Sequence, residues 1–358
     1  LEGIRKLRGL LETMKASGVT ILVSEHRLWY LRGLADRYLL LESGKLRGDL
    51  APEQMTALDQ QTRQALGLRA VDRGQLFSLC PQARPAERME PGLELHGLSC
   101  RRGRREVLHI SHVQIPKGAI VAVVGRNGAG KSTLLLTLSG LLRFRGTVRV
   151  GGKPTAPKAL SRLSYLVMQE AGHQLFSDTV LGELTLNDPD ISEQDAREIL
   201  AALGLAGLES RHPGSLSGGQ KQRLSFGVAL ASGRRLLLYD EPTSGQDGEN
   251  LLRTARQIAS ANRNAVCTLM VTHDPELIFQ CATHILHLKD GTPQAFFSLN
   301  RDGAARLWQI FGESEFDEFD SERRLNNMKY LSVWDQLVQL PYLNLYGKVV
   351  SSALELDH

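Results

Sequence analysis

Nine residues from Gly125 to Thr133 have the types and spacing needed to bind a phosphate group. They read GRNGAGKST and match the pattern G-x-x-x-x-G-K-[ST]. Glycines let the backbone curl so that successive N–H groups point at phosphate oxygens, while Lys131 would reach the outer phosphates of a nucleotide and Ser132 would bind Mg²⁺. A glycine-rich turn without a ligand is the alternative interpretation, and the flanking segments described below argue against it.

A pair of acids, Asp240 and Glu241, follows the apolar run LLLY at 236–239. Taken alone, two adjacent acids after such a run usually mark a turn or the start of a helix. Together with a phosphate loop they indicate phosphoryl transfer, in which Asp240 holds the metal ion and Glu241 orients or deprotonates the attacking water.

The elements that must position these residues can be predicted from the same stretches. Residues 119–124 read AIVAVV, a continuous apolar run typical of a strand that is buried on both faces of a parallel sheet. A helix is expected after the loop, to about residue 142, and its positive N-terminal end would also favour phosphate. Because carboxyl ends of parallel strands meet at one edge, the acids after 236–239 should lie beside the loop. The fold class is therefore α/β.

A third motif lies between these two and carries a family resemblance. Residues 216–223 read LSGGQKQR, which resembles the LSGGQ signature of the ATP-binding cassette (ABC) family. Ser217 is a natural N-cap, and Gly218 and Gly219 have no side chain that would keep a phosphate from the helix end. The resemblance implies a P-loop ABC ATPase fold: a mixed, mainly parallel sheet core with an antiparallel β subdomain and a helical signature subdomain.

Three further motifs follow the family order. Gln169, in SYLVMQE, matches the glutamine of the Q-loop; Ser244 to Asp247 (SGQD) matches the D-loop, usually SALD or SGLD; and His273, after VCTLMV, matches the switch histidine. The resemblance implies Glu241, His273 and Gln169 as catalytic residues, with Ser132, Gln169 and Asp240 at Mg²⁺. It implies ATP contacts from Gly125, Asn127, Gly128, Gly130, Lys131, Ser132, Thr133, Arg102, Ser217, Gly218, Gly219, Gln220 and Asp247.

Arg102 is a departure from the family pattern. Family members carry an aromatic residue there, stacked on adenine, whereas this chain has an arginine within the run RRGRR at 101–105. A guanidinium plane can also stack on a base. The alternative is that the arginines form a solvated edge.

An internal repeat organises the rest of the chain. Residues 19–26 (VTILVSEH) resemble 266–273 (VCTLMVTH), and one offset of 247 places both His26 on His273 and Gly44 on Gly291. Each copy predicts helix, strand ending in His, short helix, strand and glycine turn, although two αβ units can also look alike by chance. We therefore expect residues 1–58 to be the C-terminal remnant of a first cassette whose front is missing. A linker over 59–92, a complete ABC ATPase domain over 93–312, and an acidic segment with an unassigned tail over 313–358 would follow.

Two stretches resemble a narrower group. HQLFSDTV at 173–180 and SEHRLWYLRGLADR at 24–37 are similar to the ATPases of energy-coupling-factor importers, which carry vitamins or transition-metal ions. This resemblance implies three partners: a second ABC cassette, as a homodimer or a separate chain, a transmembrane coupling subunit and a substrate-capture membrane subunit. Two alternatives are a soluble ABC protein acting on ribosomes or DNA, and a catalytically inactive regulatory cassette. The short, Pro-interrupted linker disfavours the first, and the presence of Lys131, Asp240, Glu241 and His273 disfavours the second.

Composition agrees with this interpretation. The 358 residues carry 43 basic and 39 acidic side chains, a net charge of +4, which is too small to indicate a nucleic-acid surface. Four cysteines without a C-x-x-C pair predict neither a zinc site nor a disulfide framework. No apolar stretch approaches the ~18 residues of a membrane span. The expected location is cytoplasmic, peripheral on the inner face of the membrane.

Overall fold

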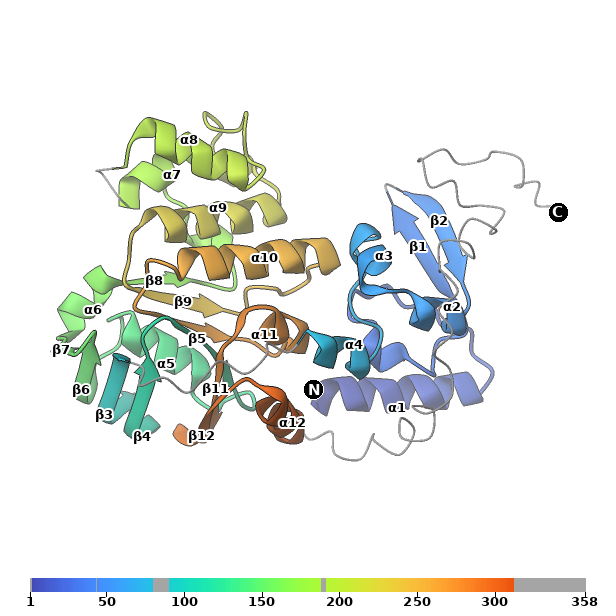
Figure 1. The fold of residues 1–358 in the computed structure, drawn as a ribbon, viewed down its shortest axis with the longest axis horizontal. Helices are drawn as coiled ribbons and strands as arrows, with labels where there is room; N and C mark the ends of the chain where they lie inside the picture. The colour runs from blue at the N-terminus through green and yellow to red at the C-terminus, as the bar shows by residue number, and fades with distance from the viewer. Residues whose placement is uncertain (1, 43, 80–89, 188–190, 312–358) are drawn as a thin grey trace. The chain divides into compact units, whose positions relative to one another are not determined.

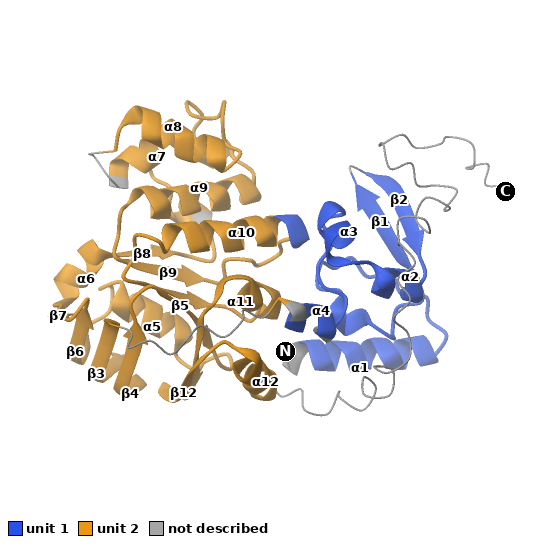
Figure 2. Ribbon diagram, viewed as in Figure 1, with its two compact units in different colours: residues 1–78, 247–249, 311–358 blue, residues 79–246, 250–310 orange. Residues whose placement is uncertain are grey.

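The computed structural model describes residues 2–42, 44–79, 90–187 and 191–311. Two compact units divide the chain (Figure 2): unit 1 comprises Leu1–Ser78, Asp247–Glu249 and Phe311–His358, and unit 2 comprises Leu79–Gln246 and Asn250–Ile310. The predicted acidic segment and tail over 313–358 lie outside the described residues.

A six-stranded sheet forms the centre of unit 2 (Figure 1). Its order is β12 (Thr292–Ser298), β11 (His284–Lys289), β5 (Ala119–Val124), β10 (Cys267–Val271), β9 (Leu236–Asp240) and β8 (Ser164–Val167). All neighbours pair in parallel except β12, which is antiparallel to β11. Every residue of β5 is buried, as its apolar run predicts for a strand covered on both faces.

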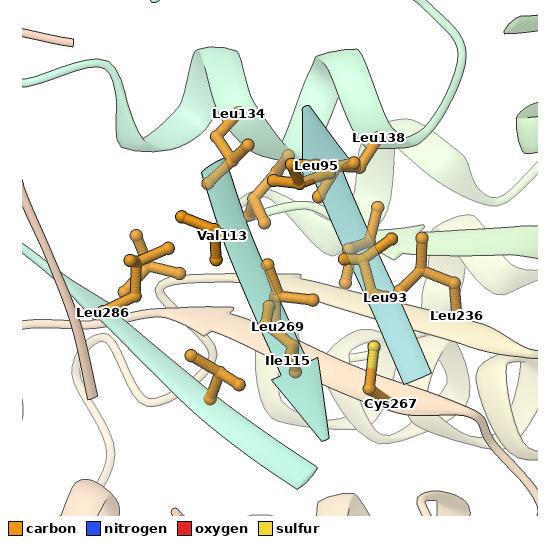
Figure 3. Close-up of a cluster of buried hydrophobic side chains, with 14 of the residues drawn as sticks. Leu93, Leu95, Val113, Ile115, Leu134, Leu138, Leu236, Cys267, Leu269 and Leu286 are labelled. Carbon is orange, nitrogen blue, oxygen red and sulfur yellow. The ribbon is translucent and has the colours of Figure 1, made fainter. Parts of the chain in front are cut away.

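A second sheet in unit 2 is antiparallel, with the order β4 (Arg105–Pro116), β3 (Pro91–Arg102), β6 (Phe144–Val150) and β7 (Lys153–Pro154). Its inner leucines and valines meet helix α5 (Lys131–Leu138) and the parallel sheet in one hydrophobic core. Figure 3 shows Leu95 and Val113 from this sheet, Leu134 and Leu138 from α5, and Leu269 from β10 converging in that core. The helix that follows the phosphate loop is thus held between the two sheets.

Helices make up the third part of unit 2. Helix α9 (Gly218–Ala231) packs against α7 (Val180–Asn187) and α8 (Glu193–Ala202), and these helices have an apolar core of their own. The other helices are α6 (Pro157–Leu163), α10 (Gly248–Ala261), α11 (Pro275–Cys281) and α12 (Arg301–Ile310), with 3-10 turns at Ala171–Gln174 and Pro213–Ser215. Parallel core, antiparallel sheet and helical part together are the P-loop ABC ATPase fold that the motifs predict.

Unit 1 is smaller and begins with helix α1 (Glu2–Ala16), followed by a 3-10 turn at Trp29–Leu31. Strands β1 (Tyr38–Glu42) and β2 (Lys45–Leu50) form an antiparallel pair, and helices α2 (Pro52–Ala57), α3 (Gln60–Ala65) and α4 (Arg73–Ser78) follow. Leu50, Met55, Val71 and Leu76 are its most deeply buried apolar residues.

The strand predicted at 19–26 is wrong. The segment has no regular secondary structure, and Leu22 is 88% exposed. Its counterpart in the repeat, β10, is hydrogen-bonded by β5 on one side and β9 on the other. No strand of the described residues pairs with 19–26, so the segment has no neighbour to complete a ladder of hydrogen bonds.

Residues 59–92 were predicted to be a linker, but the part up to Ser78 belongs to unit 1. Helices α3 and α4 lie within it, and Val71 belongs to the core of unit 1 together with Leu58. Unit 1 therefore extends to Ser78. Residues 80–89, where Pro81 and Pro85 stand, lie outside the described residues. The boundaries predicted for the cassette, 93–312, stay a prediction.

Among the described helices, none combines the length and the apolar character that crossing a membrane requires.

Candidate functional site

The loop between β5 and α5 requires glycine at its curled positions. Gly125, Gly128 and Gly130 have positive φ angles of 152°, 84° and 95°, a conformation that residues with a side chain rarely adopt. Space is limiting as well. A Cβ on Gly125 would lie 2.1 Å from the Leu288 carbonyl oxygen, and one on Gly130 would lie 2.9 Å from Leu108 Cδ2. The backbone N–H groups of the loop can therefore turn toward one point.

Lys131, the first residue of α5, is held inside this curl. Its Nζ donates to the carbonyl oxygens of Gly125 (2.7 Å) and Arg126 (3.0 Å), and its side chain is buried. Burial lowers the pKa of Lys131, and the nearby carboxylates of Glu241 and Asp240 partly oppose that shift. The ammonium group thus lies at the mouth of the loop, in reach of an anion that enters there.

Asp240 and Ser132 face each other across the edge of the parallel sheet. The strand register places Asp240 beside Val271 of β10, and Val271 beside Val123 of β5, so the ends of all three strands are level. Burial raises the pKa of Asp240, and the nearby Ser132 hydroxyl and Lys131 partly oppose that shift. A hydroxyl and a carboxylate are oxygen donors of the kind that Mg²⁺ prefers, so the two residues fit such an ion.

Glu241 and His273 lie at the same edge. Glu241 Oε1 is 3.8 Å from His273 Nε2, and both side chains are only partly exposed. The backbone of Glu241 has a positive φ of 48° and its N–H donates to the Val271 carbonyl oxygen at 2.9 Å. A non-glycine residue in this region is strained, and such strain persists only where surrounding contacts impose it. The loop therefore directs the carboxylate of Glu241 toward His273.

A buried contact that the sequence analysis did not identify joins the loops carrying these two residues. Thr243 Oγ1 donates to Asp274 Oδ2 at 3.1 Å, and Asp274 Oδ1 accepts from the N–H of Glu276 at the start of α11. The Asp-Pro pair that directly follows His273 is a recognisable helix-start signal and could have indicated it.

The signature residues begin helix α9. Ser217 and Gln220 form a capping box, with Ser217 Oγ accepting from Gln220 N (3.3 Å) and Gln220 Oε1 accepting from Ser217 N (2.9 Å). Among the described residues, apart from the chain neighbours and the backbone of the same helix, no atom lies within 4 Å of where a Cβ on Gly218 would stand, and the nearest to one on Gly219 is Arg223 Nη1 at 3.7 Å. The fold of this chain therefore leaves room for a side chain at both positions.

The remaining predicted residues lie around this centre. Gln169 is exposed two residues after β8, Asn127 is exposed in the phosphate loop, and Thr133 is buried in α5. Arg102 is exposed at the end of β3 in the β3–β4 hairpin, and Asp247 directly precedes α10. The structure thus brings Lys131, Ser132, Asp240, Glu241 and His273 together.

Comparisons with known proteins agree with this geometry. The family model described as "ABC transporter" matches residues 108–244. A Treponema denticola chain, named as an ABC transporter ATP-binding protein, is 34% identical over 80% of this chain and 60% of its own length. The energy-coupling factor transporter ATP-binding protein EcfA1 of Thermotoga maritima is 32% identical over 64% of this chain and 86% of its own. The solved structure of cbiO1 from Clostridium perfringens, part of the ABC transporter complex cbiONQ, superposes with a TM-score of 0.53 at 23% identity, covering 63% of this chain and 93% of that one.

The chain belongs to the ATP-binding proteins of the ABC transporter family. It spans about three fifths of the length of the Treponema denticola relative. Likeness to the solved structure, at 23% identity, shows the fold alone.

Proposed function

We propose that this chain binds and hydrolyses ATP with Mg²⁺ and powers solute import as the ATPase subunit of an energy-coupling-factor type transporter. The observation that carries the ATPase proposal is the edge of the parallel sheet, where Lys131 and Ser132 of the phosphate loop meet Asp240, Glu241 and His273. Each of these side chains would have a role in phosphoryl transfer, and they lie at or after the ends of three neighbouring strands, β5, β10 and β9.

Lys131 would exchange its two loop carbonyls for phosphate oxygens, which bear more negative charge and make stronger, charge-assisted hydrogen bonds. Ser132, Asp240 and Gln169 would hold Mg²⁺, which when bound neutralises phosphate charge. Glu241 would orient the attacking water and accept its proton, while His273 would hold the carboxylate and contact the outer phosphate. Thr243 and Asp274 would keep the two loops in register.

The open space at Gly218 and Gly219 supports a site shared between two cassettes. Glycine near the start of a helix costs stability relative to alanine, and nothing in this chain requires it here. We infer that both glycines are needed because this helix end approaches the phosphates bound by another cassette. The partner would be a second copy or a separate ATPase chain.

Residues 1–58 are proposed to be the end of a first cassette. The offset of 247 carries α10, β11 and β12 onto α1, β1 and β2, and both strand pairs are antiparallel. Both pairs also have a register shift at the corresponding place, between Leu40 and Leu41 and between His287 and Leu288. The turn glycines Gly44 and Gly291 have φ angles of 75° and 78°. A shared bulge and a shared turn support duplication over chance likeness.

Solute import is a more specific proposal than ATP hydrolysis, and two observations support it. The Thermotoga maritima relative is named as an energy-coupling factor transporter ATP-binding protein. The stretch HQLF includes Phe176, which is 79% exposed next to the Q-loop, as suits a residue that contacts another subunit. We propose transmembrane coupling and substrate-capture subunits as partners, and a peripheral location on the cytoplasmic face of the membrane.

Titration calorimetry with ATP and Mg²⁺ tests the nucleotide site. We expect Lys131→Ala to weaken ATP binding by at least about tenfold, a free energy of ~1.4 kcal/mol. Lys153→Ala, at an exposed lysine of β7, is the matched control and should bind ATP as the wild type does. Equal affinity in the wild type and Lys131→Ala would overturn the assignment of the phosphate loop.

Affinity isolation of the full chain from membranes of its source tests the coupling. Recovery of a polytopic membrane protein supports import, and recovery of ribosomes in its place contradicts it.

A further inference from the structure

The loop after Glu241 carries a glutamine where the ABC family usually has a leucine. The D-loop reads SGQD in this chain, with Gln246 at the position of the leucine in SALD or SGLD. Leucine offers only apolar contact there. Gln246 offers two N–H hydrogens and a carbonyl oxygen, and the structure pairs all three groups.

Gln246 is the centre of an amide clamp, which we define as the side chains of Gln222, Gln246 and Thr254 with the carbonyl of Pro242. Gln246 Nε2 donates to Gln222 Oε1 at 2.8 Å and to the Pro242 carbonyl oxygen at 3.3 Å. Gln246 Oε1 accepts from Thr254 Oγ1 at 3.0 Å. Gln222 Nε2 donates to the same Pro242 carbonyl.

The side chains of the amide clamp are buried or partly buried, which favours one arrangement of their hydrogen bonds. Thr254 is only 3% exposed, and both glutamines are partly buried. A buried polar group that loses its partner pays a desolvation penalty. The clamp is therefore favourable when complete, and each member holds the others in one arrangement.

The clamp joins the signature helix to the loop of the catalytic acid. Gln222 lies on α9, five residues after the cap Ser217, whereas Pro242 directly follows the strained residue Glu241. A second contact lies one turn further along α9, where Phe226 stacks on Tyr239 with ring centroids 5.2 Å apart. Tyr239 is the residue before Asp240. Helix α9 is thus fixed to the strand through the aromatic pair and to the loop after it through the clamp.

We propose that Gln246 is a positioning residue that makes the signature helix and the Glu241 loop move as one body. The proposal rests on the ATPase function above and adds a link within one cassette. A displacement of α9 then moves the Pro242 carbonyl and with it the backbone of Glu241. The carboxylate comes into register for water activation only while α9 is correctly placed. Lys131 and its loop take no part in the clamp, so nucleotide affinity does not depend on it.

The test uses the full chain with the substitution Gln246→Leu, which is close in size and restores the usual family residue. Gln194→Leu is the matched control, because Gln194 is exposed on α8 and its amide reaches only Glu198 of the same helix. Hydrogen exchange is measured over residues 217–225 without nucleotide, and ATP affinity and turnover are measured separately.

Gln246→Leu should speed amide exchange over 217–225 at least about tenfold, as the loss of net hydrogen bonds predicts. Turnover should fall about tenfold with ATP affinity within about twofold of wild type. Gln222→Leu should speed amide exchange over 217–225 as much as Gln246→Leu does. The double variant, Gln222→Leu with Gln246→Leu, should exchange no faster than either single variant, because both substitutions break the same network.

Unchanged exchange in Gln246→Leu, or additive effects in the double variant, would overturn the clamp. Weakened ATP affinity together with slower turnover would show a general structural role and also overturn it. Absence of turnover in the wild-type chain counts against the proposed ATPase function, whereas the exchange measurement still decides the clamp.

Discussion

At the scale of single residues, the site depends on charged groups held where water is scarce. Lys131 and Asp240 are both substantially buried, so desolvation lowers the pKa of the lysine and raises that of the aspartate. Each shift disfavours the charged form, and the two charges stabilise each other only in part. A phosphate would balance the charge of Lys131, and a divalent cation would balance the charge of Asp240. This is the electrostatic reason for such a site to bind both ions.

Asp240 gives a prediction with a definite pH dependence. Because its folded-state pKa is raised by burial, the folded chain holds this proton to a higher pH than the unfolded chain does. Stability therefore falls as pH rises from the ordinary aspartate range through the raised pKa. Asp240→Asn has no charge to bury. We expect it to be more stable than wild type at about pH 7, with the advantage vanishing near about pH 3.

Urea unfolding at both pH values measures this difference. Asp178→Asn, at an exposed aspartate, is the control and should follow the wild type at each pH. An Asp240→Asn variant less stable than wild type at neutral pH would show that the lost interactions with Ser132 and Lys131 outweigh the desolvation of the charge.

Residues that act through local sequence could be predicted, and residues that act through distant contacts could not. The stretch GRNGAGKST specifies its own loop, since the positive φ angles and the following helix depend on neighbours in the chain. Gln246 shows the opposite case. Its role depends on Gln222 and Thr254, which reach it from two different helices. The SGQD departure was visible in the sequence, but nothing local shows what the amide contacts.

At the scale of elements, the N-terminus of the signature helix supports our proposal that it faces another cassette. Its N-terminus is capped by Ser217 and Gln220, and its middle is packed tightly against α8. Gly218 has open space around it, whereas a Cβ on Gly227 would lie 2.6 Å from Leu203 Cδ1. Of these two glycines, Gly227 is needed by the packing of its own chain and Gly218 is not.

Gly218→Ala should therefore raise stability and lower activity. We expect a gain of up to about 0.5–1 kcal/mol in the free energy of unfolding, since alanine loses less backbone entropy than glycine in a helix. Turnover should fall about tenfold or more because the added methyl group keeps the helix end from the phosphates. Denaturant unfolding and an ATPase assay measure the two effects.

Gly227→Ala is the contrasting control and should destabilise the chain by overpacking against Leu203. If Gly218→Ala hydrolysed ATP at the wild-type rate, the signature would have no role at a phosphate.

The prediction of secondary structure was wrong where a strand depends on pairing with neighbouring strands. Residues 19–26 have the composition of a strand, and their counterpart β10 is one. Composition favours an extended backbone, but a strand forms only when neighbours complete its hydrogen bonds. The helices within 59–78 were missed for a related reason: each has only six residues, and helices this short depend on tertiary packing for their stability.

At the scale of the whole molecule, the chain holds one set of catalytic groups and parts of a repeat. Unit 2 carries the phosphate loop, the signature and the acids, while unit 1 matches only elements from α10 to β12. In the repeat, the exposed segment at 19–26 corresponds to β10, a central strand of unit 2. We propose that activity comes from unit 2 paired with another cassette.

The central claim is that Glu241 activates water for ATP hydrolysis in that paired state. Glu241→Gln keeps the size and the hydrogen-bonding reach of the side chain but cannot accept the proton. Measured on the full chain with its co-purified partners, ATP affinity should stay at the wild-type value. Turnover should fall at least about a hundredfold, and an ATP-dependent dimer should accumulate in light scattering. Turnover within about tenfold of wild type, a barrier change of at most ~1.4 kcal/mol, would contradict the account.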